Sequence, residues 1–141
     1  SCALGLEQVR RIDDLVAKRE RVAQRYNEHL WNLREYLKPL PEIMGHHRSW
    51  FVYSVILKQH IDRDAVVSKL NEWGIQVGKY FSPPIHLQTF YREKYGYKEG
   101  DFPTTEDTAN RSIALPFYTQ ISDGDVDAVC ESLRDALTRS T

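Results

Sequence analysis

The sequence predicts an α+β domain in which a long N-terminal helix and later helices pack on a small antiparallel or mixed sheet of about three strands. First, 141 residues suit a single domain spanning 1–141, because either half alone would be too short to bury a core. Second, 41% hydrophobic and 28% charged residues are typical of a folded globular chain and argue against disorder. Third, helical apolar spacing at both ends encloses short β-branched and aromatic runs.

Residues 1–37 have the apolar spacing of one long connecting helix, which we expect to end just before Pro39. The apolar stripe consists of Val9, Ile12, Val16, Ala23, Tyr26, Leu30, Leu33 and Leu37. A helix of this length reaches ~45–50 Å, which exceeds the width of the remaining domain. Its N-terminal part, with Leu4, Leu6 and Val9, is therefore expected to leave apolar side chains without a partner in this chain.

Three later runs have the β-branched and aromatic composition of strands. They are Trp50–Leu57, Ile75–Val77 with an extension toward Phe81, and Ser112–Leu115, which Pro116 stops. Together they account for the small sheet.

Two helices are predicted between these strands. Asp62 or Asp64 can cap the first, and Gly74 supplies its left-handed stop. Its apolar face is Val66, Val67, Leu70 and Trp73. The second is shorter and begins near Thr104, where Thr104-x-x-Asp107 has the spacing of a capping pair after Pro103.

The last helix has the strongest signals in the chain. Ser122 and Asp125 form a capping-box variant at its start. Its apolar stripe is Val126, Val129, Cys130, Leu133 and Leu137. Because Cys130 lies on this stripe, it is expected to be an inert core thiol rather than a nucleophile.

Charge and composition exclude several classes of function. A net charge of −1 gives no overall attraction to nucleic acid, and no apolar run is long enough to cross a membrane. Two cysteines cannot form a disulfide framework, which indicates a reducing, cytoplasmic location. The adjacent His46 and His47 lack the further ligands of a metal site, so no metal is expected and a solvated turn is the better interpretation.

Residues 78–103 are the stretch in which chemistry could lie. Seven aromatic residues gather there: Tyr80, Phe81, Phe90, Tyr91, Tyr95, Tyr97 and Phe102. Long connections are uncommon unless they have a function, and Tyr and His side chains suit a pocket wall that must also orient a ligand. A loop packed down by its own aromatic rings would show the same composition. His86, which can exchange a proton near neutrality, could equally be a structural hydrogen-bonding residue.

Several motifs resemble the DegT/DnrJ/EryC1/StrS family of sugar aminotransferases, in order and over nearly the whole chain. They are Ala-Leu-Gly-Leu-Glu-Gln-Val-Arg-Arg-Ile-Asp at 3–13, Trp-Phe-Val-Tyr-Ser-Val at 50–55, Leu-Asn-Glu-Trp-Gly-Ile at 70–75, Tyr-Phe-Ser-Pro-Pro-Ile-His-Leu-Gln at 80–88, Tyr-Gly-Tyr-Lys-Glu-Gly-Asp-Phe-Pro at 95–103 and Leu-Pro-Phe-Tyr at 115–118. The stretch at 80–88 is the most specific.

The resemblance implies the C-terminal small domain of a fold-type-I enzyme that uses pyridoxal 5′-phosphate (PLP) and acts as a homodimer. Such enzymes transfer an amino group, from glutamate, to a keto group on a nucleotide-linked sugar in polysaccharide, lipopolysaccharide or antibiotic-sugar biosynthesis. The family's Schiff-base lysine and its cofactor contacts precede the region that this chain matches. The resemblance therefore implies no catalytic and no cofactor-binding residue in this chain, and no transamination by this chain alone.

The same resemblance places Tyr80, Phe81, Ile85 and His86 on the sugar-substrate side of the site, so that residues 78–103 become an aromatic active-site loop. Their expected contribution is to shape the pocket, orient polar groups and exclude water. The alternative from another class is a non-catalytic α+β module of this family that binds a small ligand or a protein through the aromatic loop.

Overall fold

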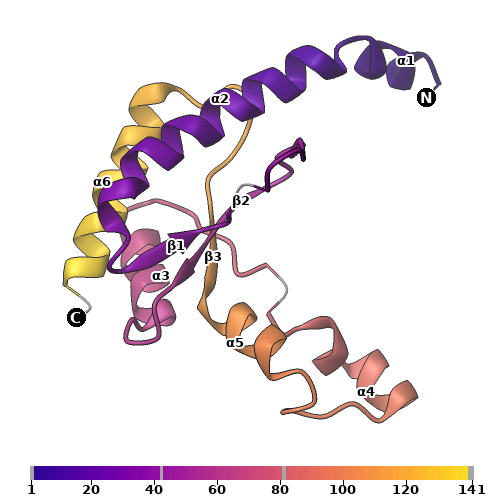
Figure 1. Ribbon diagram of the computed structural model, residues 1–141, viewed down its shortest axis with the longest axis vertical. Helices are drawn as coiled ribbons and strands as arrows, with labels where there is room; N and C mark the ends of the chain where they lie inside the picture. The colour runs from indigo at the N-terminus through magenta and orange to yellow at the C-terminus, as the bar shows by residue number, and fades with distance from the viewer. Residues whose placement is uncertain (1, 42, 81, 140–141) are drawn as a thin grey trace.

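The computed structural model describes residues 2–41, 43–80 and 82–139, and it forms an α+β domain (Figure 1). Its helices are α1 (Cys2–Arg10), α2 (Ile12–Leu30), α3 (Arg63–Glu72), α4 (Thr89–Tyr95), α5 (Pro103–Arg111) and α6 (Asp123–Thr138), with short 3-10 helices η1 (Trp31–Leu33) and η2 (Ile85–Leu87). Its strands are β1 (Leu37–Pro39), β2 (Tyr53–Leu57) and β3 (Ser112–Leu115). The predicted fold class is confirmed.

The sheet is antiparallel throughout and has the order β1-β2-β3. Strand β2 pairs Leu57 with Leu37 of β1 and Tyr53 with Leu115 of β3. Burial alternates along β2, so one face of the sheet packs against the core while the other is half-exposed. Pro39 lacks a backbone N–H and lies at the end of the short edge strand β1, a position that sheets tolerate.

Two of the three predicted strands are found, and the third lies elsewhere. Residues 75–77 form no strand, because only Gly78 pairs there, in a single bridge with Ala114 of β3. The prediction of a strand at Ile75–Val77 is therefore wrong. Its apolar side chains still pack against the core, which explains their β-like composition. The third strand is β1, a three-residue segment too short to have a pattern of its own.

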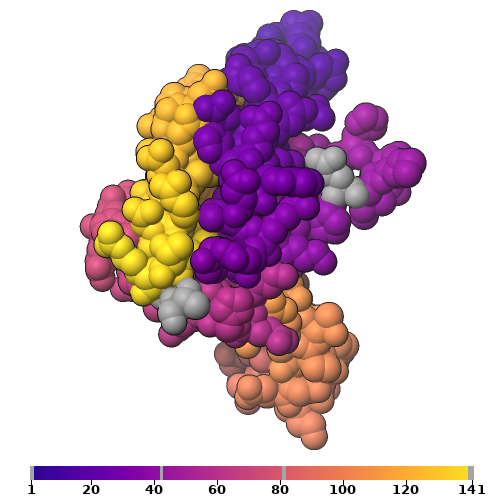
Figure 2. Space-filling model, turned by 60° about the vertical axis from the view of Figure 1, so that its left-hand side comes forward, coloured from indigo at the N-terminus to yellow at the C-terminus, as the bar shows by residue number. Residues whose placement is uncertain are grey.

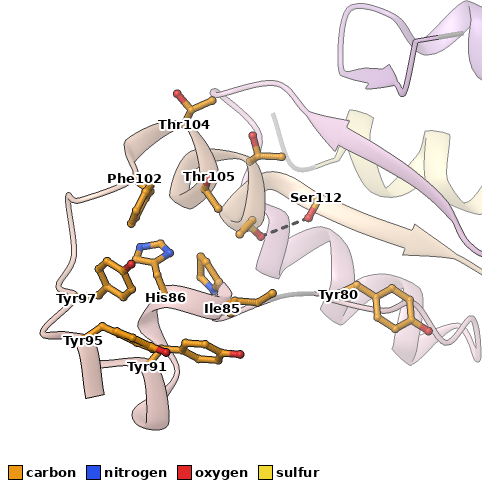
Figure 3. Close-up of a pocket in the computed structure, with 13 residues that line it drawn as sticks. Tyr80, Ile85, His86, Tyr91, Tyr95, Tyr97, Phe102, Thr104, Thr105 and Ser112 are labelled. Carbon is orange, nitrogen blue, oxygen red and sulfur yellow. Dashed lines mark hydrogen bonds between the residues drawn. The ribbon is translucent and has the colours of Figure 1, made fainter. Parts of the chain in front are cut away.

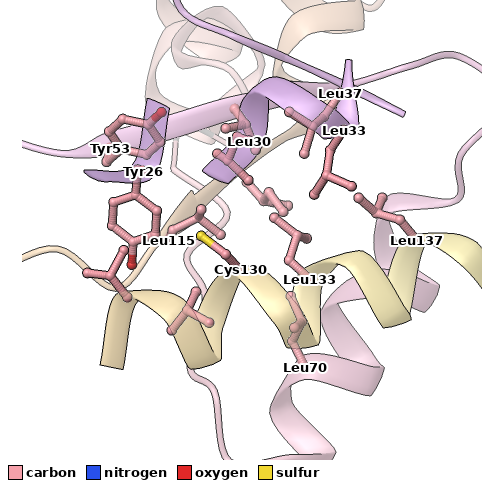
Figure 4. Close-up of a cluster of buried hydrophobic side chains, with 14 of the residues drawn as sticks. Tyr26, Leu30, Leu33, Leu37, Tyr53, Leu70, Leu115, Cys130, Leu133 and Leu137 are labelled. Atoms are coloured by element: carbon pink, nitrogen blue, oxygen red, sulfur yellow. The ribbon is translucent and has the colours of Figure 1, made fainter. Parts of the chain in front are cut away.

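The core lies between the buried face of the sheet and helices α2, α3 and α6. Figure 4 shows Leu133 and Cys130 of α6 on the side of that helix that faces Leu30 of α2, and Leu70 of α3 belongs to the same cluster. These side chains are fully or almost fully buried. Beside them, an aromatic stack joins helix to sheet, with the rings of Tyr26 and Tyr53 4.7 Å apart. Each tyrosine hydroxyl also donates a hydrogen bond, to Pro116 O (2.7 Å) and Asn27 Oδ1 (2.6 Å) respectively.

The single helix expected over residues 1–37 is wrong in two places. It breaks at Arg11, whose backbone (φ −105°, ψ 9°) separates α1 from α2, and it ends at Leu30 rather than before Pro39. Leu33 and Leu37 keep the burial that their spacing predicts. They do so from η1 and β1, because the chain must turn back after α2 for β1 to pair with β2. Tertiary pairing thus outweighs a continuing helical pattern.

The exposed apolar stripe predicted for the first helix is confirmed. Helix α1 buries none of its residues, and Leu4 is 68% exposed. Figure 1 shows α1 extending away from the sheet, and in Figure 2 it forms a projection at one end of the molecule. Leu6, Val9 and Ile12 are also more than half exposed, so the stripe continues into α2.

Most of the predicted helix boundaries are confirmed by hydrogen bonds. Asp62, and not Asp64, caps α3 by accepting from the N–H groups of Asp64 and Ala65, and Gly74 follows the helix at φ +79°. Ser122 and Asp125 form the capping box of α6. The stripe of α6 is buried as predicted, whereas Trp73, which directly follows α3, is 42% exposed and does not belong to the core.

The predicted cap of α5 is wrong. The helix begins at Pro103, its N-cap residue is Phe102, and no side chain caps it there. Asp107 instead pairs with Arg111 one turn later within the helix. Pro103 explains the start of the helix, since its missing N–H costs nothing at the first helical position.

An ion pair ties α2 to α6 at the edge of the core. Arg25 donates from Nε and Nη2 to the two carboxylate oxygens of Asp127, at 2.9 and 2.7 Å, and His29 Nε2 lies 2.8 Å from Asp127 Oδ1. The hydrogen bond from Arg25 is the main cause that lowers the pKa of Asp127 below its ordinary value. The pair is about one-third exposed, so water weakens it.

We expect Leu133→Ala to destabilise the domain by about 2 to 5 kcal/mol, because it leaves a cavity at a fully buried site between helices. Leu4→Ala is the matched control and should change the free energy of unfolding by less than about 0.5 kcal/mol. Urea denaturation of both variants measures the difference. Equal losses of stability would contradict the assignment of the core.

A second expectation concerns pH. Because the pKa of Asp127 is lowered in the folded state, the carboxylate adds stability above its ordinary value near 3.9, and this stability is lost as the pH falls through the folded pKa. Asp127→Asn should therefore be less stable than wild type at about pH 7, and the gap should narrow toward about pH 3. Denaturant titrations at both pH values test this, with Asp13→Asn, which removes an exposed carboxylate of α2, as control. A gap that widens on acidification would refute it.

Candidate functional site

A cavity of about 820 Å³ lies beyond the end of the sheet, between α5 and the segment that runs from Tyr80 through α4 to Phe102 (Figure 3). Its walls are mostly aromatic and aliphatic, with hydroxyl groups from one side of α5. The lining residues are Tyr80, Pro84, Ile85, His86, Tyr91, Tyr95, Tyr97, Phe102, Thr104, Thr105, Thr108, Ala109 and Ser112.

The segment 78–103 is more ordered than the loop that the sequence suggests. It contains η2 and α4, and α4 ends at Gly96, which adopts φ +73°. Seven residues rich in aromatic side chains give little helical periodicity, which is why the pattern of α4 was missed. Gly96 directly after this run was the signal that could have revealed a helix end.

Ring contacts connect much of this aromatic cluster. Tyr91 and Tyr95 stack with ring centroids 6.2 Å apart, Tyr95 lies 5.9 Å from Tyr97, and Tyr97 meets Phe102 edge-on at 5.5 Å. The aromatic residues therefore hold the segment together, as the structural interpretation of the loop predicts. Because the same rings line the cavity, they form its wall as well.

His86 lies at the centre of this arrangement, in η2, and only 8% of its surface is exposed. Its ring packs edge-on against Phe102 with centroids 4.8 Å apart. Its Nε2 atom lies 2.9 Å from Oε1 of Glu106 in α5. In Figure 3 the imidazole lies between Tyr97 and the helix that carries Thr104 and Thr105.

Glu106 gathers several donors besides the imidazole. The N–H of Gly100 donates to both carboxylate oxygens at 3.0 Å, and the N–H of Phe102 donates to Oε1 at 3.2 Å. The hydrogen bond from Gly100 is the main cause that lowers the pKa of Glu106, followed by that from His86. The carboxylate is therefore ionised at neutral pH. Through its hydrogen bonds it connects α5, which carries it, to η2 and to the turn before α5.

Tyr80 and Ile85 are half-exposed and border the same cavity. Figure 3 shows Tyr80 apart from the other rings, at one end of the site. Its ring lies over Gly78, where an added Cβ would come within 2.9 Å of the tyrosine ring. Gly78 is fixed by two backbone hydrogen bonds with Ala114, and Lys79 Nζ lies 2.8 Å from Asp64. The chain leading to Tyr80 is thus anchored to β3 and α3.

The structure brings three of the four predicted site residues, Tyr80, Ile85 and His86, to one cavity. Phe81 lies outside the described residues. Glu106, Thr105 and Thr108, and Thr104 as a residue of the cavity, were not predicted from the sequence. Their signal was the spacing of Thr104, Thr105 and Thr108 along one helix, which places them near one face.

The other residues considered in the sequence, Cys130, His46 and His47, lie outside the cavity. Cys130 is buried, and burial raises the pKa of its thiol to about 12, as expected for an inert core cysteine. His46 and His47 are exposed in a turn. Among residues 2–41, 43–80 and 82–139, no group of three or more side chains could hold a metal ion, and no helix could span a membrane.

The model of the DegT/DnrJ/EryC1/StrS aminotransferase family matches residues 1–134. The chain belongs to this family. Its relatives include the spore coat polysaccharide biosynthesis protein SpsC of Bacillus subtilis, 34% identical over 137 residues that make up 94% of this chain and 35% of SpsC. The resemblance noted in the sequence is thereby confirmed.

Solved structures described as aminotransferases have the same fold. The aminotransferase TlmJ of Streptoalloteichus hindustanus is 30% identical, with a TM-score of 0.84 over 97% of this chain and 35% of TlmJ. Spr1654 of Streptococcus pneumoniae, 23% identical, matches in fold with a TM-score of 0.89 over 98% of this chain and 34% of that protein. It has been solved in PLP and PMP forms. This member of the family spans about a third of the length of these relatives.

The two cysteines give a direct check of the burial assigned here. Cys2 is exposed and should react with a thiol reagent in the native state, whereas Cys130 should react only after denaturation. Counting reactive thiols before and after adding denaturant measures this, and Cys2→Ser should abolish the native reaction. Rapid native labelling of that variant would show that Cys130 is accessible.

Proposed function

We propose that this chain is the small domain of a PLP-dependent sugar aminotransferase, and that the cavity beside α5 forms part of the binding site for a nucleotide-linked keto sugar. Membership of the family supports an aminotransferase. The name of SpsC, a protein of spore coat polysaccharide biosynthesis, supports a sugar as acceptor. From the resemblance in the motifs we further propose glutamate as amino donor, a homodimeric parent and a cytoplasmic location.

The observation that carries this proposal is the composition of the cavity wall. Aromatic faces pack well against the apolar C–H faces of a sugar ring, while hydroxyl groups recognise its substituents. Here Tyr91, Tyr95 and Tyr97 supply rings on one side, and Thr104 and Thr105 of α5 are among the residues that line the other. The volume of about 820 Å³ is in the range of cavities that hold small molecules.

The half-exposed Tyr80 and Ile85 are proposed to contact the sugar directly, because their side chains border the cavity and remain open to solvent. His86 is proposed to contact it through the small part of its surface that faces the cavity. These side chains would shape and desolvate the sugar site rather than move protons.

The described residues of the cavity do not fit PLP itself. Its lining has no lysine for a Schiff base and no carboxylate to face a pyridine nitrogen. Lys79, the lysine closest in sequence to Tyr80, pairs with Asp64. We therefore assign the cofactor and its reactive lysine to other polypeptide of the parent.

The exposed stripe on α1 and the start of α2 supports a larger parent. Leu4, Leu6, Val9 and Ile12 are all more than half exposed, although large apolar patches are uncommon on isolated domains. We propose that this stripe packs against the remaining part of the parent protein. That part would comprise about 250 residues, given the length of the relatives.

The test is the sequence encoded upstream of Ser1 and the activity of the joined polypeptide. We expect an upstream segment with a lysine in a PLP-binding context, and amino transfer from glutamate to a keto nucleotide sugar. His86→Ala in that protein should lower kcat/KM for the sugar more than about twofold, and His60→Ala, at an exposed position, should not.

Two outcomes would contradict the proposal. A natural start at this point, without any upstream domain, would favour the non-catalytic module. An active enzyme whose kcat/KM is unchanged in the His86→Ala variant would remove His86 from the sugar site and leave the aminotransferase assignment intact.

A further inference from the structure

Glu106 does not line the cavity, yet its carboxylate accepts hydrogen bonds from several residues of the cavity wall and the turn beside it. Its side chain is 13% exposed and that of His86 is 8% exposed, so water offers little competition for this pair. Three groups from different segments donate to one carboxylate: the imidazole of η2 and the N–H groups of Gly100 and Phe102.

The hydrogen bond fixes which ring nitrogen of His86 carries the proton. A carboxylate only accepts, so the neutral imidazole must hold its proton on Nε2, the atom 2.9 Å from Glu106 Oε1. Nδ1 is then a lone-pair acceptor, and none of the described residues donates to it.

The ring plane is fixed by packing as well. Phe102 meets the imidazole edge-on at 4.8 Å and Tyr97 does so at 6.3 Å. The N–H of Phe102 is itself held by Glu106. The carboxylate of Glu106 therefore determines which nitrogen of the imidazole carries the proton. It also binds the backbone of Phe102, whose ring packs against that imidazole.

We propose that Glu106 is a positioning residue that holds His86 in its Nε2–H form and so makes the imidazole, through Nδ1, an acceptor for a hydrogen-bond donor of the ligand. This assignment rests on the proposed function for the identity of the ligand, which would present a sugar hydroxyl. It specifies the chemistry further, because a ligand that covers Nδ1 without offering it a donor would leave this acceptor unpaired and bind poorly.

The test uses the ¹⁵N-labelled chain alone and reads the two ring nitrogens of His86 by long-range proton–nitrogen NMR. In wild type we expect a protected imidazole proton on Nε2. In Glu106→Ala this proton should exchange too fast to be seen, and the two nitrogen shifts should move toward each other. The amides of Gly100 and Phe102 should exchange at least about tenfold faster.

Glu99→Gln is the matched control, since it removes an exposed carboxylate from the same turn, and it should change none of these signals. Glu106→Gln keeps the volume and one neutral acceptor, so it should retain the Nε2 proton with a smaller hydrogen-bond shift. This variant decides the question if Glu106→Ala disturbs the amide spectrum of α6.

A proton found on Nδ1 in wild type would overturn the proposal, as would an Nε2 proton that stays protected in Glu106→Ala or an unchanged shift in Glu106→Gln. None of these readouts needs the sugar or the cofactor. Their failure would therefore leave the proposed aminotransferase function untouched, and failure of that function would leave the positioning of His86 standing.

Discussion

The fold depends on leucine side chains packed between three helices and one face of a small sheet. Three short strands bury too little surface to be stable by themselves. Here α2, α3 and α6 cover the buried face of β2, and Leu30, Leu70 and Leu133 meet there without exposure to water. This layer holds β3 in place, and hence the point where α5 ends and β3 begins, beside the cavity.

The cavity itself is held by a different kind of interaction. Helix α5 is followed without a loop by β3, so the cavity wall that α5 forms is directly connected to the sheet. The opposite wall, from η2 to Phe102, contributes His86, which is the one buried polar residue among the described residues when the tyrosines and Cys130 of the core are set aside. This second wall is held together by aromatic contacts and by the carboxylate of Glu106 instead of an aliphatic core. The two walls thus have separate physical supports.

The sequence was most informative where a local pattern and the tertiary structure agree. The capping box at Ser122 and the buried stripe through Cys130 and Leu133 could be predicted because one helix face satisfies both the backbone and the core. The family motif at 80–88 contains three predicted site residues that line the cavity, and their contact with a sugar remains a prediction. The break at Arg11, the end of α2 and the strand β1 could not be predicted, since sheet pairing and not local preference determines them. Glu106 was missed for a related reason: its donors lie four, six and twenty residues away, at no regular period.

The orientation of Tyr80 and Ile85 has a consequence for how this fold can diversify. Both side chains border the cavity from segments whose backbones are anchored elsewhere, by Gly78 to Ala114 and by η2 to α5. Replacing either side chain alters the shape of the cavity wall and leaves the packing of the buried core unchanged, because neither residue belongs to that core. Surface-facing substitutions of this kind cost little folding free energy. One scaffold can therefore accumulate new ligand preferences while its own stability stays almost constant.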